Sequence, residues 1–111
     1  MSLEIIFGPM YAQKTTMLLT LLNKSKDFRK IILIKSKKDN RYNTIGKVIT
    51  HGGFTDNNIP TVIADKLSDI SDTIEEKNID IIGIDELHFF DDPGTVVTWL
   101  RNGKNIHVST L

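Results

Sequence analysis

The chain has 111 residues, of which 40% are apolar, and its formal net charge is zero. This length and composition suit one compact domain spanning 1–111 and argue against disorder. Zero net charge gives no support to a nucleic-acid-binding role, and the absence of cysteine excludes disulfides and cysteine-ligated metals within these residues.

The first third of the sequence alternates between strand and helix patterns. The apolar run Leu3–Phe7 ends at Gly8-Pro9, which predicts a buried strand followed by a turn. Apolar residues then recur at helical spacing, so we expect a helix from Lys14 to about Lys26. The segment Lys30–Lys35 is apolar on both faces, as is typical of a strand inside a parallel sheet.

The remainder continues this alternation after a long loop. Residues 36–58 show no sustained periodicity, and loops of that length tend to be functional. The further elements that we expect are a strand at 61–64, a helix containing Leu67, Ile70 and Ile74, a strand at 79–84, a helix that Pro93 begins and Gly103 stops, and a strand at 105–109. This order predicts an α/β domain with a mainly parallel sheet and flanking helices.

A phosphate-binding loop is the first motif with chemical meaning. The residues between the first strand and the first helix are Gly8-Pro9-Met10-Tyr11-Ala12-Gln13-Lys14-Thr15. The pattern G-x-x-x-x-G-K-[ST] cradles phosphates with backbone N–H groups, while its lysine neutralises the β- and γ-phosphates and its hydroxyl binds Mg²⁺. Gln13 stands where that pattern has glycine, so the match alone is equally compatible with an ordinary strand-turn-helix.

Two further groups of residues follow predicted strands. Asp85 and Glu86 come directly after the strand at 79–84, where Asp85 could hold Mg²⁺ and Glu86 could accept the proton of an attacking hydroxyl. The alternative for this pair is a solvated strand end. Asp39-Asn40-Arg41-Tyr42 and Thr50-His51 lie in the long loop, and each residue taken singly is more typical of an exposed loop than of a binding site.

Together these motifs resemble the thymidine kinase family of animals, bacteria, poxviruses and other large DNA viruses. The family carries G-P-M-[FY]-[SA]-G-K-[ST]-T, D-x-R-Y, T-H and I-D-E-x-[QH]-F-F in this order. The corresponding segments here are Gly8–Thr16, Asp39–Tyr42, Thr50-His51 and Ile84–Phe90. The resemblance covers nearly the whole chain and implies a P-loop, RecA-like core.

The resemblance also implies roles for individual residues. It implies a Mg²⁺-dependent transferase that phosphorylates thymidine with ATP for DNA precursor synthesis, in which Glu86 is the catalytic base on the 5′-hydroxyl and Thr15 and Asp85 bind the metal. Met10 and Phe89 correspond to positions lining the thymidine pocket, although both are equally typical of a core. The implied ATP and Mg²⁺ contacts are Gly8, Pro9, Met10, Tyr11, Ala12, Gln13, Lys14, Thr15, Asp39, Asn40, Arg41, Asp85, Glu86, Leu87 and His88.

Other expectations concern the surroundings of this ATP-binding part. The family's C-terminal part, with its substrate lasso and cysteine zinc site, is absent from this sequence, so we expect a domain truncated relative to the family and no zinc site within it. A degenerate or truncated nucleotide-binding module without catalysis remains the alternative. The family forms tetramers, which makes a homo-oligomer possible. The sequence carries no targeting signal or membrane-spanning stretch, and we expect a cytoplasmic protein without membrane or nucleic-acid partners.

Overall fold

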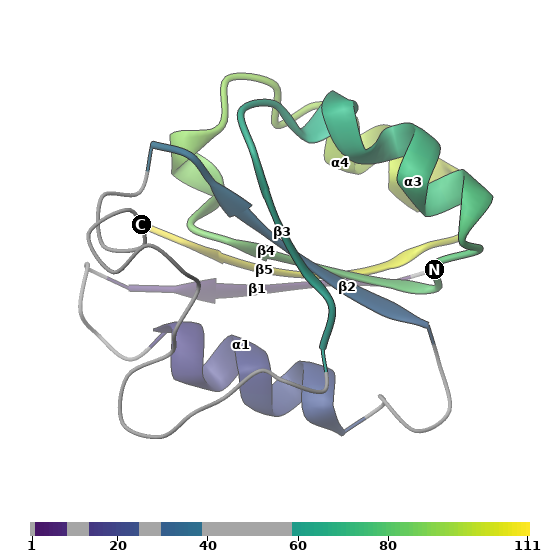
Figure 1. Cartoon of the computed structure of the whole chain (residues 1–111). Helices are drawn as coiled ribbons and strands as arrows, with labels where there is room; N and C mark the ends of the chain where they lie inside the picture. The colour runs from purple at the N-terminus through teal and green to yellow at the C-terminus, as the bar shows by residue number, and fades with distance from the viewer. Residues whose placement is uncertain (1, 9–13, 25–29, 39–58) are drawn as a thin grey trace.

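Five parallel strands form a single sheet in the order β1-β5-β4-β2-β3 (Figure 1). This computed structural model describes residues 2–8, 14–24, 30–38 and 59–111. The strands are β1 (Ser2–Phe7), β2 (Ile31–Ser36), β3 (Thr61–Ala64), β4 (Ile81–Asp85) and β5 (Asn105–Thr110). The expected α/β architecture is confirmed, and the sheet is parallel throughout.

Helices cover both faces of this sheet. The helix α1 (Lys14–Asn23) lies against one face, and α3 (Ser71–Glu76) and α4 (Thr95–Arg101) lie on the other (Figure 1). Two short 3-10 helices are also present. The first, η1 (Leu67–Ile70), precedes α3, and the second, η2 (Leu87–Phe89), follows β4. Among the described residues, no helix has the length and apolar character needed to cross a membrane.

β1 is an edge strand, which corrects the expectation of a buried strand. It pairs with β5 alone among the described elements. Leu3, Ile5 and Phe7 are 42%, 43% and 70% exposed, and they alternate with Ile6, which packs toward α1. An apolar run alone does not separate an edge strand from an inner one, because that difference depends on which strands lie on either side.

α1 packs through a narrow apolar face onto the middle of the sheet. Its buried leucines contact a cluster that includes residues of β2 and β4; the leucines are Leu18, Leu19 and Leu22. Met17 of the same helix is 52% exposed. Gly83 of β4 permits this close approach, since a Cβ there would lie 2.6 Å from Leu22 Cδ1. The first turn of α1 is thereby held near the end of β4.

Parallel register brings the carboxyl ends of four strands to one edge of the sheet. Lys35 of β2 is the partner of Asp85 of β4, and Phe7 of β1 is the partner of Thr110 of β5. In parallel α/β sheets this edge is where ligands bind, because loops and helix N-termini converge there.

Candidate active site

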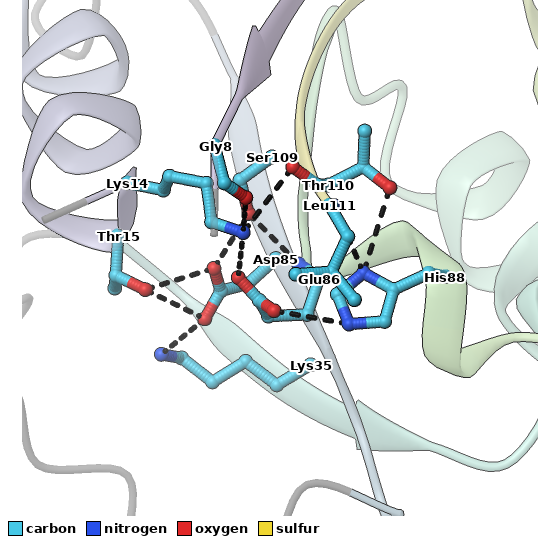
Figure 2. A network of polar contacts seen from close by, with 10 residues as sticks. All are labelled: Gly8, Lys14, Thr15, Lys35, Asp85, Glu86, His88, Ser109, Thr110 and Leu111. Atoms are coloured by element: carbon cyan, nitrogen blue, oxygen red, sulfur yellow. Dashed lines mark hydrogen bonds and ion pairs between the residues drawn. The ribbon is translucent and has the colours of Figure 1, made fainter. Parts of the chain in front are cut away.

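Four buried charged side chains meet at this edge of the sheet (Figure 2). Lys14, Lys35, Asp85 and Glu86 are between 0% and 3% exposed, although such residues are almost never fully buried unless paired. They come from α1, β2, and the end of β4 with the residue that follows it. Opposite charges are paired in this cluster, so it is a built site and not a solvated strand end.

The carboxylate of Asp85 accepts contacts from three different elements. Thr15 Oγ1 of α1 lies 3.0 Å from Oδ1 and 3.2 Å from Oδ2. Ser109 Oγ of β5 donates to Oδ1 at 2.8 Å, and Lys35 Nζ of β2 lies 3.5 Å from Oδ2. Because these donors approach both oxygens, the plane of the carboxylate is fixed before any ligand binds.

Glu86, the residue after Asp85, has an uncommon backbone conformation. Its φ of 56° and ψ of 61° place it in the left-handed region, which residues other than glycine, asparagine and aspartate seldom adopt. Its N–H donates to Ser109 Oγ at 2.8 Å. Its carboxylate lies between two basic side chains, with Oε1 3.2 Å from Lys14 Nζ and Oε2 3.2 Å from His88 Nε2. The turn therefore directs the Glu86 carboxylate toward the start of α1.

The ammonium group of Lys14 is fully engaged by protein groups. It donates to the carbonyl oxygens of Gly8 at 2.7 Å and Thr110 at 3.2 Å, in addition to its ion pair with Glu86. Three contacts use the three donors that an ammonium group has. The lysine thus connects the ends of β1 and β5 to the carboxylate beyond β4.

His88 connects the end of β5 to Glu86. The N–H of Leu111 donates to Nδ1 at 3.3 Å, and Thr110 Oγ1 lies 3.5 Å from the same nitrogen. On the other side of the ring, Nε2 lies 3.2 Å from Glu86 Oε2. Among the described residues, neither of these two atoms makes a well-aligned hydrogen bond.

The structure brings together six of the residues that the sequence singled out: Gly8, Lys14, Thr15, Asp85, Glu86 and His88 (Figure 2). Leu87 packs against the core on the side of α3 and α4. The ring of Phe89 lies 4.5 Å from that of His88, centroid to centroid. The remaining predicted site residues, Pro9–Gln13, Asp39–Arg41 and His51, lie outside the described residues.

Two residues of the cluster, Lys35 and Ser109, were missed by the sequence-based prediction. A lysine inside the apolar run of β2 was a usable signal, because a charge at an inner strand position needs a buried partner. Ser109 offered no comparable signal, since a serine near the end of a strand is common.

Thr15 and Asp85 form a donor set that fits Mg²⁺. Both present hard oxygen atoms, and Mg²⁺ in nucleotide sites typically takes only one or two protein ligands, with waters and phosphate oxygens completing its shell. Among the described residues, no group of three or more His, Cys, Asp or Glu side chains could hold a metal alone. The arrangement therefore suits a metal that arrives with a phosphate ligand.

Comparison with known proteins gives a consistent result. The family model described as "Thymidine kinase" matches residues 1–111. A thymidine kinase of Choristoneura fumiferana entomopoxvirus is 39% identical over 118 residues, covering 100% of this chain and 61% of the relative. A thymidine kinase of Oryza sativa subsp. japonica is 40% identical over 95 residues, covering 81% of this chain and 34% of the relative.

A third relative, thymidine kinase 1 of Dictyostelium discoideum, is 37% identical over 117 residues, covering 98% of this chain and 48% of the relative. The chain thus spans between 34% and 61% of the lengths of these three relatives.

Proposed function

Because this chain belongs to the thymidine kinase family, we propose that it transfers the γ-phosphoryl group of ATP to the 5′-hydroxyl of thymidine. The products are ADP and thymidine monophosphate, a DNA precursor. The observation that carries this proposal is the position of Glu86. A buried carboxylate lies beside the lysine of the phosphate-loop motif and directly after the aspartate that fits a metal.

Lys14 is the proposed ligand of the β- and γ-phosphates. It is the first residue of α1, and the N-terminus of a helix favours phosphate through its free N–H groups and its dipole. In the ligand-free protein the ammonium group is paired with Glu86 and two carbonyl oxygens. Phosphate oxygens replace these partners when ATP binds.

Thr15 and Asp85 are the proposed ligands of Mg²⁺. Bound there, Mg²⁺ supplies charge neutralisation on the β- and γ-phosphate oxygens. Thr15 Oγ1 lies within 3.2 Å of both carboxylate oxygens of Asp85. Little rearrangement is therefore needed to present these oxygen atoms to one metal ion.

Glu86 is the proposed general base. Once Lys14 turns to the phosphates, Oε1 is free to accept the proton of the 5′-hydroxyl, while His88 stays beside Oε2. The hydroxyl oxygen then forms its bond to the γ-phosphorus, and the bond from that phosphorus to the bridging oxygen of ADP breaks. Glu86 holds the proton and later releases it to solvent.

The other residues of the family motifs keep the roles that those motifs assign. We propose that Pro9–Gln13 surround the phosphates, that Asp39–Arg41 contact ATP, and that Met10 and Phe89 line the thymidine pocket. His88 and Leu87 remain proposed members of the nucleotide site. The partners that we propose are ATP and thymidine, in the cytoplasm, with no nucleic-acid or membrane partner and with possible homo-oligomers.

The proposal is tested with the full chain by calorimetry with Mg-ATP and by the formation of labelled thymidine monophosphate. Glu86→Gln should keep nucleotide binding and lower turnover by about 10²- to 10⁴-fold. Lys14→Ala should weaken binding itself. Lys38→Ala is the matched control, because Lys38 is an exposed lysine paired with exposed Asp91.

The outcomes separate the competing interpretations. Binding of Mg-ATP with formation of thymidine monophosphate that depends on Glu86 supports the kinase. Binding without turnover, persisting after Gln13→Gly, supports a nucleotide-binding module without catalysis. No binding of Mg-ATP by the wild-type chain contradicts the proposal.

A further inference from the structure

Ser109 occupies a central place in the polar network (Figure 2). Its side chain is fully buried, and its hydroxyl makes two short hydrogen bonds of 2.8 Å each. The hydroxyl donates to Oδ1 of Asp85 and accepts the backbone N–H of Glu86. One hydroxyl therefore connects two consecutive residues that have different proposed tasks.

The contact to Glu86 matters because of the backbone conformation there. A glutamate keeps a left-handed backbone conformation only where the surrounding structure holds that conformation in place. The backbone N–H of Glu86 donates its hydrogen bond to Ser109 Oγ. A rotation of the peptide between Asp85 and Glu86 would break that hydrogen bond and turn the Glu86 carboxylate away from Lys14. The serine thus holds the turn that aims the proposed base.

The contact from Ser109 to Asp85 differs from the contact that Thr15 makes with this carboxylate. Thr15 is itself a proposed metal ligand and so changes its contacts when Mg-ATP binds. Ser109 is 0% exposed, and its only proton is already donated to Asp85, so it has no donor left for a ligand and is not itself a proposed metal ligand.

We propose that Ser109 is a positioning residue that fixes the metal-binding carboxylate of Asp85 and the base Glu86 relative to each other. This inference rests on the proposed function for the identity of the ligand, Mg-ATP. Hydrogen-bond partners of metal ligands orient those ligands, and their loss typically lowers metal affinity by 10- to 100-fold. The same hydroxyl here also sets the direction of the neighbouring base.

The test measures how ATP binding by the full chain depends on Mg²⁺. In Ser109→Ala, the Mg²⁺ concentration for half-maximal enhancement of ATP binding should rise by about tenfold. ATP binding in the presence of a chelator should stay at the wild-type level. A general weakening of the fold would also lower ATP binding in the presence of the chelator, so unchanged binding there is specific to positioning.

Two further variants control for packing and for stability. Ser109→Cys keeps the shape but is a weak donor and acceptor, and it should behave like Ser109→Ala if the hydrogen bonds are responsible. Ser71→Ala removes a hydroxyl that accepts a hydrogen bond from Trp99 Nε1 at 3.3 Å in the opposite layer, and it should leave the Mg²⁺ dependence unchanged.

A second measurement needs no ligand. Amide hydrogen exchange at Glu86 should be faster in Ser109→Ala than in the wild type, because its N–H loses its acceptor. If the wild-type chain binds Mg-ATP and Ser109→Ala shows the same Mg²⁺ dependence as the wild type, this inference is overturned and the proposed function is not. A wild-type chain that binds no Mg-ATP overturns the proposed function, and this inference with it.

Discussion

Lys14 and Lys35 neutralise Glu86 and Asp85 pairwise in the candidate site. Each of the four side chains is at most 3% exposed, so an unpaired charge among them would be costly. This pairing reduces the cost of burying two adjacent carboxylates. In the proposed function, binding of Mg-ATP exchanges partners inside a site that is already charged, which limits the reorganisation that the proposed reaction requires.

Lys35→Met tests this balance at the residue where no ligand role is proposed. The change removes the buried ammonium group but keeps the apolar stem, leaving Asp85 with only hydroxyl partners among the contacts described above. The free energy of unfolding, measured with urea, should fall by about 3 kcal/mol. In an Asp85→Asn background, Lys35→Met should lower the free energy of unfolding by less, because the negative charge of Asp85 has already been removed. Equal costs in the two backgrounds would show that the pair does not interact.

At the scale of elements, the position of α1 on β4 determines whether the site assembles. Gly83 lies opposite Leu22, and a Cβ there would come within 2.6 Å of Leu22 Cδ1 and 3.1 Å of Leu33 Cδ1. Both leucines are fully buried, so neither side chain has free space to enter. The distance between helix and strand is therefore set by the absence of a side chain at one residue.

Gly83→Ala should destabilise the protein by about 1–3 kcal/mol, because α1 must move away from the sheet. The displacement should also separate Thr15 from Asp85, and the Mg²⁺-dependent part of ATP binding should weaken. Gly94→Ala is the control, since a Cβ at Gly94 meets nothing within 4 Å. If the two variants have equal unfolding free energies, the close approach does not constrain the helix.

Asp92 connects two helical segments in the opposite layer. Its carboxylate accepts the N–H groups of Leu67 and Ser68, each at 2.9 Å, and the hydroxyl of Thr95 at 3.3 Å. Burial alone would raise the pKa of Asp92, but the backbone hydrogen bonds from Ser68 and Leu67 outweigh it and hold the pKa below the ordinary value of 3.8. The start of η1 is thus fixed to the turn before α4 by an ionised side chain.

Asp92→Asn should lower the free energy of unfolding at pH 7 by about 1 kcal/mol, because asparagine has one oxygen to accept the two N–H groups that the carboxylate accepts. A lowered pKa in the folded state means that this contribution is present above pH 3.8 and is lost as the pH falls through the folded value. The wild type and the variant should therefore converge in stability in acid. Urea unfolding across this range checks the prediction, and a constant difference down to the lowest pH would contradict it.

The sequence predicted most elements because their signals are local. β2 and β4 are apolar runs, and their burial at every position follows from neighbours on both sides. The edge position of β1 depends instead on strand order, which no local pattern contains. The same holds for the site: the motif gave Asp85, whereas its contacts with Lys35 and Ser109 depend on the register of strands that are distant in sequence.

At the scale of the whole molecule, the β1–β5 pair brings the end of the chain back beside its beginning. Glu4 of β1 is the register partner of His107 of β5, and their side chains approach to 3.8 Å between Oε1 and Nδ1. The His107 side chain is 12% exposed, and its Nδ1 makes no hydrogen bond with the residues that the structure describes. An edge strand with one neighbour is thus joined to the sheet partly through a histidine that is poorly solvated.

His107 gives the stability of the whole fold a dependence on pH. Burial lowers the pKa of His107 below its ordinary 6.5, and the charge of Glu4 opposes this shift only in part. Below pH 6.5 the unfolded chain therefore binds a proton that the folded chain resists, so stability should fall from pH 6.5 down to the folded pKa. His107→Gln should remove this component, which the difference from the wild type in urea unfolding isolates from other histidines. Glu4→Gln should widen the pH window, because the opposing charge is lost; an unchanged profile in both variants would show that the pair does not couple to folding.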